Sequence, residues 1–435
     1  MPTPLPPPVI VLPGITAIHL RDEYTLPIQN VWSVLSKDYE RVAMHPDDFR
    51  YEAVEPALVR PDQVFEVAYR ECIEELRYNL RDKEDLPVPV FPFAYDWRMP
   101  LVDTERRLAD FVGEVIDRTK LLKHYHASGY ADHPTVDLVG HSMGGLIIAG
   151  YLQGQKGAAP VRKVVSLGSP FRGSFEAVIK ILTGTANLGT APPSSREREA
   201  ARVTPALYHL IPTFAKGLEI TDPALPTTLF DPAAWQPSVI DSVAEFIRLH
   251  GLPVGDTKAR ALSAFTNLLT LARTHAQRRA ALRLPDVGLA TSDWLAVVGV
   301  DAETRVRLKL ARNAGKPEFV LSNDDRANRW DAPNAESRRQ TGDGTVPYEG
   351  AVPDFLGEDN LVCVTPSDFG YWELQDRLLT KAAGFHGMLP TMDMLHRLIV
   401  RFLKDRPDKR KNTWGRPAPG VAVKDWKPPL ALATP

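Results

Sequence analysis

The chain has 435 residues, of which 24% are charged and 44% are hydrophobic, and its formal net charge is −2. These proportions are those of a soluble globular protein, and they exclude a disordered or fibrous chain. The nearly balanced charge gives no general attraction to nucleic acid or to an anionic membrane.

Two cysteines, Cys72 and Cys363, are too few for a disulfide framework, and a single bridge between them is less favoured than two free thiols. Residues 1–14 lack the basic and apolar regions of a secretory signal, and no run reaches the about 18 apolar residues of a membrane span. We therefore expect a cytoplasmic protein, unless the N-terminus has been trimmed. The oligomeric state is left open.

The first predicted strand is the apolar, β-branched run at residues 9–12, which stops at Pro13-Gly14. A second apolar run covers residues 88–94. Apolar residues spaced by three and four over residues 103–126 then predict an amphipathic helix.

Residues 135–139 form the next predicted strand, and the chain turns at the glycine-rich residues 140–145. The apolar residues 146–149 begin a helix that we expect to be buried on every side. Residues 161–167 are another strand. This alternation of strands and helices predicts a parallel sheet with crossover helices, the α/β class.

From residue 175 to 315 the pattern is helical, chiefly at 234–250 and 257–283, with Pro-rich loops and no convincing strand. Strand character returns at residues 319–321 and 361–364, and residues 389–404 are the last clear helix. The tail is first basic and then Pro-rich, and we expect it to be solvated or loosely packed. The predicted organisation is a core of residues 8–174 and 316–404, an inserted helical cap of residues 175–315, and a tail of residues 405–435.

The motif Gly140-His141-Ser142-Met143-Gly144 fits G-x-S-x-G, the nucleophile elbow of α/β-hydrolases. The serine of such an elbow lies on a strained turn between a strand and a helix, where only glycine neighbours avoid collision. An apolar strand precedes this motif and an apolar helix follows it. This context favours a nucleophilic Ser142 over a merely structural glycine turn.

A serine nucleophile needs a base and an orienting carboxylate, and in this fold they follow the serine in the order acid, histidine. Asp343, between two glycines, is the favoured acid, and His386, before the last helix, is the favoured base. Asp324 and Asp325 are the rival acids, and an ordinary Asp-Gly turn is the structural alternative for Asp343. The rival histidine, His396, fits the face of a helix better.

Two backbone amides should form the oxyanion hole: that of Met143, after the nucleophile, and that of Ile15, after Pro13-Gly14. No metal or cofactor is expected, because His124, His126 and His133 have no carboxylate or cysteine at ligand spacing. The arginines of residues 272–283 predict a polar helix face rather than a nucleic-acid site.

Several motifs together resemble the lecithin:cholesterol acyltransferase family, which includes lysosomal phospholipase A2 and bacterial relatives. The resemblance extends over residues 8 to 404. The motifs that carry it are Tyr95-Asp96-Trp97-Arg98, the elbow at 140–145, Gly168-Ser169-Pro170-Phe171-Arg172-Gly173, residues 204–212 and residues 342–346.

The resemblance implies an α/β-hydrolase core with a helical cap and a lid, and transfer of an acyl chain through an acyl-serine to water or an alcohol. It implies Ser142 as nucleophile, Asp343 as acid and His386 as base, with Ile15 and Met143 at the oxyanion positions. Asp96 and Arg98 are then structural. Residues 17–60, where relatives carry a membrane-binding subdomain, are charged here, so a membrane-surface substrate is not supported.

The predicted function is a serine ester hydrolase that acts through an acyl-enzyme on a small-molecule ester or lipid-like substrate with an apolar chain. The first alternative is an O-acyltransferase with the same three residues, which the sequence does not separate from a hydrolase. The second is a non-catalytic lipid-binding protein on a hydrolase scaffold, which the complete set of residues disfavours.

Overall fold

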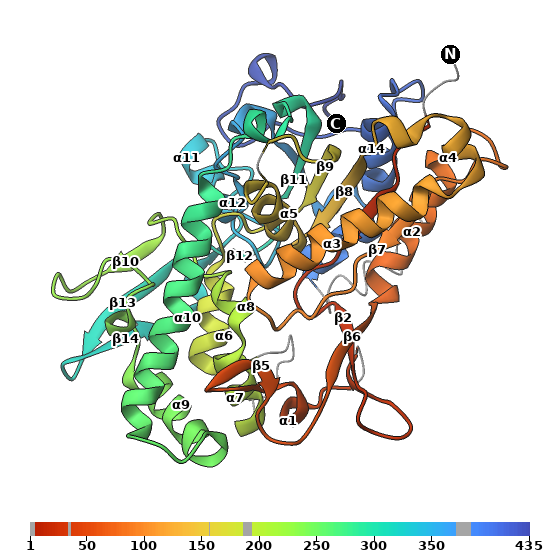
Figure 1. The fold of residues 1–435 in the computed structure, drawn as a ribbon. Coiled ribbons are helices and arrows are strands. Elements are labelled where there is room, and N and C mark those ends of the chain that lie inside the picture. Colours follow the sequence, from red (N-terminus) through yellow and green to blue (C-terminus); the bar gives the residue numbers. More distant parts are fainter. Residues whose placement is uncertain (1–4, 34–35, 156, 186–193, 371–383) are drawn as a thin grey trace.

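The computed structural model describes residues 5–33, 36–155, 157–185, 194–370 and 384–435. Its centre is a six-stranded sheet in the order β16-β11-β9-β8-β1-β7, in which all paired neighbours run parallel (Figure 1). The strands are β1 (Val9–Leu12), β7 (Val90–Pro92), β8 (Val136–His141), β9 (Val161–Leu167), β11 (Trp294–Gly299) and β16 (Val362–Val364).

Helices flank this sheet in two packed pairs. Helix α3 (Leu101–Lys120) packs on α5 (Met143–Gln153), and α2 (Glu66–Leu80) packs on α14 (Asp393–Lys404). Every residue of β1, β8 and β11 is buried. Strands covered on both faces need mainly apolar side chains, which is why β1 and β11 read as continuous apolar runs. Strand β8 also carries the buried Asp137, which pairs with Arg162. The α/β-hydrolase fold predicted from the sequence is confirmed.

The segment between β1 and α2 forms two small antiparallel sheets beside the core. The first has the order β3-β2-β6 and the second pairs β4 with β5. Their bounds are β2 (Ile18–Asp22), β3 (Gln29–Trp32), β4 (Met44–His45), β5 (Asp48–Glu52) and β6 (Val59–Val64), with α1 (Tyr39–Val42) between β3 and β4.

A mainly helical region lies beyond one end of the central sheet, at the lower left of Figure 1. It also contains the three-stranded sheet β10-β13-β14. Its elements are α6 (Phe175–Thr183), α7 (Ser195–Val203), α8 (Pro205–Tyr208), α9 (Pro237–His250), α10 (Thr257–Ala280), β10 (Leu218–Ile220), β13 (Leu308–Asn313) and β14 (Lys316–Val320). Shorter elements elsewhere are α4 (Lys123–Ala127), β12 (Thr304–Arg305), β15 (Arg326–Ala327), α11 (Ala335–Arg338) and α12 (Tyr348–Ala351).

The sequence analysis missed one strand and expected another in the wrong sheet. The expectation of no strand within 175–315 fails at β11, which pairs with β9 and β16 inside the central sheet. The strand at 319–321 was expected to return the chain to the core, but β14 pairs with β13 instead. Both errors arise because pairing partners are set by tertiary contacts that a local pattern does not contain. The chain limits of core and cap stay a prediction.

A buried cluster of hydrogen-bonded polar side chains connects helix α10 to the core. Glu105 of α3 accepts hydrogen bonds from Arg278 and from Nε2 of His275, the latter at 2.6 Å, and Arg278 also bonds the carbonyl of Gly150. Burial raises the pKa of Glu105 to about 7, although Arg278 opposes this rise. Arg279 is buried and donates to the carbonyl of Phe171. The arginines therefore do not form the single polar face that the sequence predicts.

The sequence predicts a solvated or loosely packed C-terminal tail. In the structure, the tail instead packs along the edge strand β16. Cys363 of β16 and Arg416 exchange both backbone hydrogen bonds, at 2.8 and 3.0 Å. Arg416 also pairs with Asp368, and the indole of Trp426 donates to the carbonyl of Leu361. The tail thereby covers an edge that would otherwise present unpaired backbone groups.

Both cysteines, Cys72 and Cys363, are buried free thiols.

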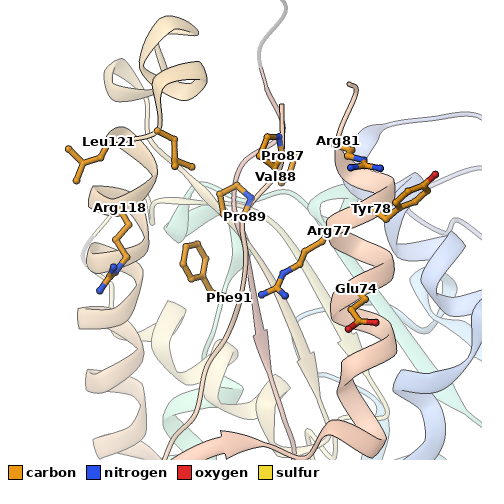
Figure 2. Close-up of a pocket in the computed structure, with 11 residues that line it drawn as sticks. Glu74, Arg77, Tyr78, Arg81, Pro87, Val88, Pro89, Phe91, Arg118 and Leu121 are labelled. Atoms are coloured by element: carbon orange, nitrogen blue, oxygen red, sulfur yellow. The ribbon is translucent and has the colours of Figure 1, made fainter. Parts of the chain in front are cut away.

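A surface groove of about 730 Å³ lies between α2 and α3, over the start of edge strand β7 (Figure 2). Arg77, Tyr78 and Arg81 line it from α2, and Arg118 lines it from α3. The groove therefore lies at the amino end of a parallel strand, whereas binding sites of such sheets lie at the carboxyl ends.

Among the described helices, none combines the length and the apolar character that crossing a bilayer requires.

Candidate active site

Ser142 lies on the turn between β8 and α5, where the sequence places it. Its backbone has φ 53° and ψ −124°, a conformation that costs energy for a residue with a side chain. This is the strained strand-to-helix turn of a nucleophile elbow. The turn holds the hydroxyl at the carboxyl end of β8 and directly before the first residue of α5, whose N-terminus favours negative charge.

The elbow glycines are required by close backbone contacts. A Cβ atom on Gly140 would lie 2.7 Å from the amide nitrogen of Gly145. A Cβ atom on Gly144 would lie 2.4 Å from the carbonyl oxygen of Leu12, at the end of β1. Real Cβ atoms do not approach backbone atoms so closely, so a larger residue at either position forces the turn or its neighbour to move.

We predict that Gly144→Ala lowers the free energy of unfolding by ~1–3 kcal/mol, because the added methyl group overlaps the carbonyl of Leu12. The matched control is Gly113→Ala in α3, where an added Cβ meets nothing within 4 Å. That change should raise stability by about 0.5–1 kcal/mol through helix propensity. Urea unfolding of both variants checks the prediction, and equal stability of the two would contradict it.

The structure brings together the three side chains that the sequence singles out. Nε2 of His386 lies 2.8 Å from Oγ of Ser142, and Nδ1 of His386 lies 2.6 Å from Oδ2 of Asp343. The amide of His386 also donates to the carbonyl of Asp343 at 2.9 Å. All three residues are buried. This arrangement can pass the hydroxyl proton to an imidazole whose other nitrogen is held by a carboxylate.

Asp343 is oriented by its own loop. Its Oδ1 accepts hydrogen bonds from the amides of Thr345 and Val346, at 3.0 and 2.7 Å, which leaves Oδ2 for His386. The loop fits against the end of β11 because Gly299 has no side chain there: a Cβ atom on Gly299 would lie 2.6 Å from Cβ of Asp343. The strand that sequence reasoning missed is thus the one that supports the predicted acid.

Gly168, at the end of β9, makes room for the same pair. It has φ 54°, and a Cβ atom on it would lie 3.0 Å from Oδ2 of Asp343 and 3.3 Å from Nδ1 of His386. The sequence contains a signal for this role, because Gly168 opens the motif Gly168-Ser169-Pro170 directly after a strand. We assign Gly168 to the site as a steric requirement.

The rival residues lie elsewhere. Asp325 faces Arg305 at 3.6 Å, and Asp324 lies in a short turn, where its amide donates to Oγ of Ser322. His396 lies in α14, where its Nε2 donates to the carbonyl of Pro390 at 2.7 Å. The geometry therefore favours Asp343 and His386 over these alternatives.

The two predicted oxyanion amides belong to Met143, which follows Ser142, and to Ile15, which follows Gly14. Met143 is the first residue of α5, and among the described residues its amide has no backbone acceptor. A Cβ atom on Gly14 would lie 3.0 Å from Cβ of Ser142, so the loop that carries Ile15 passes close to the serine. The amide of Gly14 itself donates to the hydroxyl of Tyr69 at 2.9 Å. Tyr69 has no sequence signal beyond its place on the apolar face of a helix.

Arg98 of the Tyr95-Asp96-Trp97-Arg98 segment is buried in an ion-pair cluster. Its guanidinium lies 2.7 Å from Asp96 and 3.0 Å from Glu52 of β5, and these carboxylates raise its pKa against the effect of burial. Its backbone carbonyl accepts from the amide of Ala206, at the start of α8. The cluster ties this segment to the N-terminal sheets, in line with a structural role.

Comparison with known proteins relates this chain to one enzyme family. The lecithin:cholesterol acyltransferase family model matches residues 85–240, which include Ser142 but neither Asp343 nor His386. No curated protein matches the chain in sequence.

Solved structures share the fold at low sequence identity. A chain of the crystal structure of the Tle4–Tli4 complex aligns with a TM-score of 0.57 and 15% identity, over 80% of this chain and 89% of that chain. The product of the gene lin2722 from Listeria innocua aligns with a TM-score of 0.32 and 12% identity, over 93% of this chain and 96% of that chain, which is too low to support an argument. Residues 85–240 are thus similar to the lecithin:cholesterol acyltransferase family, and the chain has an α/β-hydrolase fold.

Proposed function

We propose that this protein is a serine ester hydrolase that cleaves an acyl ester with an apolar chain through an acyl-enzyme. The observation that carries the proposal is the hydrogen-bonded chain from Oγ of Ser142 through His386 to Asp343, at 2.8 and 2.6 Å. The match to a family named for acyl transfer between a phospholipid and a sterol supports an acyl ester as substrate.

In the proposed reaction, Oγ of Ser142 attacks the ester carbonyl while Nε2 of His386 takes the hydroxyl proton. Asp343 stabilises the imidazolium that forms. The amides of Met143 and Ile15 donate to the oxyanion of the tetrahedral intermediate. His386 then gives the proton to the leaving alcohol, and the acyl group stays on Ser142. A water molecule, activated by the same histidine, releases the acid and restores the serine.

The acyltransferase alternative differs only in the last step, where an alcohol replaces water. The family match favours keeping this alternative, because the matched family transfers acyl groups. Both reactions use the same three side chains, so the geometry of Ser142, His386 and Asp343 does not distinguish a hydrolase from an acyltransferase. The reaction products distinguish them.

The test is a panel of p-nitrophenyl esters from acetyl to palmitoyl, with phosphatidylcholine micelles and a primary alcohol as further additions. We expect turnover that increases from acetyl to longer chains, because an apolar arm adds binding energy that a short acyl group lacks. Free fatty acid as the product identifies a hydrolase, and an alkyl ester identifies a transferase. A folded protein that binds lipid but turns over none of these esters would instead identify a lipid-binding protein.

A further inference from the structure

The loop that follows β1, residues 13–16, is held on several sides by side chains from other parts of the chain. The hydroxyl of Tyr95 donates to the carbonyl of Pro13 at 2.7 Å, and the indole of Trp32 donates to the carbonyl of Thr16 at 2.9 Å. The amide of Gly14 donates to the hydroxyl of Tyr69 at 2.9 Å. These contacts hold the loop whose Ile15 amide is the predicted oxyanion donor.

Tyr69 differs from Tyr95 and Trp32 because its hydroxyl also contacts a residue next to the nucleophile. Its hydroxyl lies 2.6 Å from Nδ1 of His141, the residue before the nucleophile. Nε2 of His141 in turn lies 2.9 Å from the carbonyl oxygen of His386. Tyr69 and His141 are both buried, so neither loses these partners to water. One chain of hydrogen bonds thereby joins the loop at Gly14 to the backbone of His386.

The direction of each hydrogen bond in this chain is determined. A carbonyl oxygen only accepts, so Nε2 of His141 carries a proton and donates to His386. Burial, together with the nearby His386 side chain, lowers the pKa of His141 to about 3, although the bond to the His386 carbonyl opposes this, so the ring is neutral and Nδ1 has no proton. Nδ1 must therefore accept from the hydroxyl of Tyr69, whose oxygen is left to accept from Gly14. Each donor and each acceptor in this series of hydrogen bonds is thereby matched by a partner of the correct kind.

We propose that Tyr69 and His141 form a positioning pair that holds the oxyanion loop and the backbone of His386 in register with each other. The inference rests on the proposed function, because it assigns the pair to the same site. Neither side chain is placed on a reacting atom. The pair positions the oxyanion loop and His386, which must be aligned with each other when the oxyanion and the imidazolium form together. Small misplacements of such groups have large effects on rate.

The test is Tyr69→Phe, which removes one oxygen and keeps the ring. The amide of Gly14 and Nδ1 of His141 then lose their partner together. We expect kcat for a p-nitrophenyl ester to fall on the order of 10- to 100-fold with KM nearly unchanged, because the loss affects alignment in the transition state rather than substrate binding. An unchanged kcat would overturn the proposal.

Tyr125→Phe is the matched control. The hydroxyl of Tyr125 is also buried in the fold and donates to a backbone carbonyl, that of Pro6, at 2.7 Å. Pro6 precedes β1, whereas Gly14 follows it, so the control removes a tyrosine hydrogen bond to the backbone at the far end of the same strand. We expect a fall in Tm and no change in kcat. An equal loss of kcat in both variants would show a general effect of lost stability and would overturn the proposal.

A double-mutant cycle tests whether the pair acts as a unit. Combining Tyr69→Phe with His141→Gln should reduce kcat no further than the more damaging single change. If the two reductions multiply, the residues act independently and the proposal fails.

A measurement on the unaltered protein decides the case even if Tyr69→Phe does not fold. The ¹⁵N chemical shifts of His141 at neutral pH should show a protonated Nε2 and a bare Nδ1, and the reverse tautomer would overturn the proposal. Failure of the proposed function is distinguishable from both results. In that case the unaltered protein turns over no ester and Ser142 takes no fluorophosphonate label.

Discussion

Replacing Ser142 with alanine is expected to abolish covalent labelling by a fluorophosphonate and to reduce ester turnover by at least about 10,000-fold. The reason is that Oγ of Ser142 lies 2.8 Å from Nε2 of His386, within reach of the base. Without it, the histidine has no nucleophile to activate. The label is quantified by intact-protein mass spectrometry, and turnover is measured with the best p-nitrophenyl ester of the panel.

Ser166→Ala provides the control for removal of a buried serine hydroxyl. Ser166 lies on the neighbouring strand β9, and its Oγ accepts from the indole of Trp294 at 3.0 Å. This variant should lose some stability but keep both labelling and turnover. If Ser142→Ala keeps the turnover of the unaltered protein, the acyl-serine mechanism is wrong.

Replacing Asp343 with asparagine is expected to lower kcat on the order of 10,000-fold without unfolding the protein. Oδ1 accepts from the amides of Thr345 and Val346, so the carbonyl oxygen of the asparagine must take that place. The amide nitrogen then faces Nδ1 of His386 and donates to it. This stabilises the tautomer with a proton on Nε2, which cannot take the proton of Ser142.

The matched control is Asp368→Asn. Asp368 is also buried, and its Oδ2 accepts from the amide of Thr365 at 2.8 Å, but its charged partner is Arg416 rather than a histidine. This variant should lower Tm through the lost ion pair and keep kcat close to that of the unaltered protein. Full activity in Asp343→Asn would return Asp324 and Asp325 to consideration as the acid.

The elbow was the part of the site most accessible to prediction from the sequence. Its residues are contiguous, and the strand before it and the helix after it are buried on all sides, so local hydrophobicity indicated both. The chain order of the fold then narrowed the acid and the base to a few positions. The match to an acyltransferase family over residues 85–240 agrees with the resemblance found from the motifs.

Strand β11 is the element of the central sheet that the local sequence pattern failed to predict. Trp294–Gly299 is a continuous run of apolar residues and a terminal glycine, so the signal of a buried strand was present. The surrounding helices and Pro-rich loops led to its assignment to the cap. The pairing of β11 with β9 and β16 is a contact between segments far apart in the sequence, and such contacts override local preference.

The amino-acid sequence by itself determined the chemistry available at the site: a serine between glycines, a histidine and an aspartate in the order that an α/β-hydrolase requires. Only the tertiary structure decided which aspartate and which histidine meet Ser142, because the pairing of Ser142 with His386 spans 244 positions. It also decided that Tyr69, an ordinary residue of an amphipathic helix, reaches the loop at Gly14. The physical reason is that hydrogen bonds depend on distance in space, and the packing of helices on the sheet sets that distance.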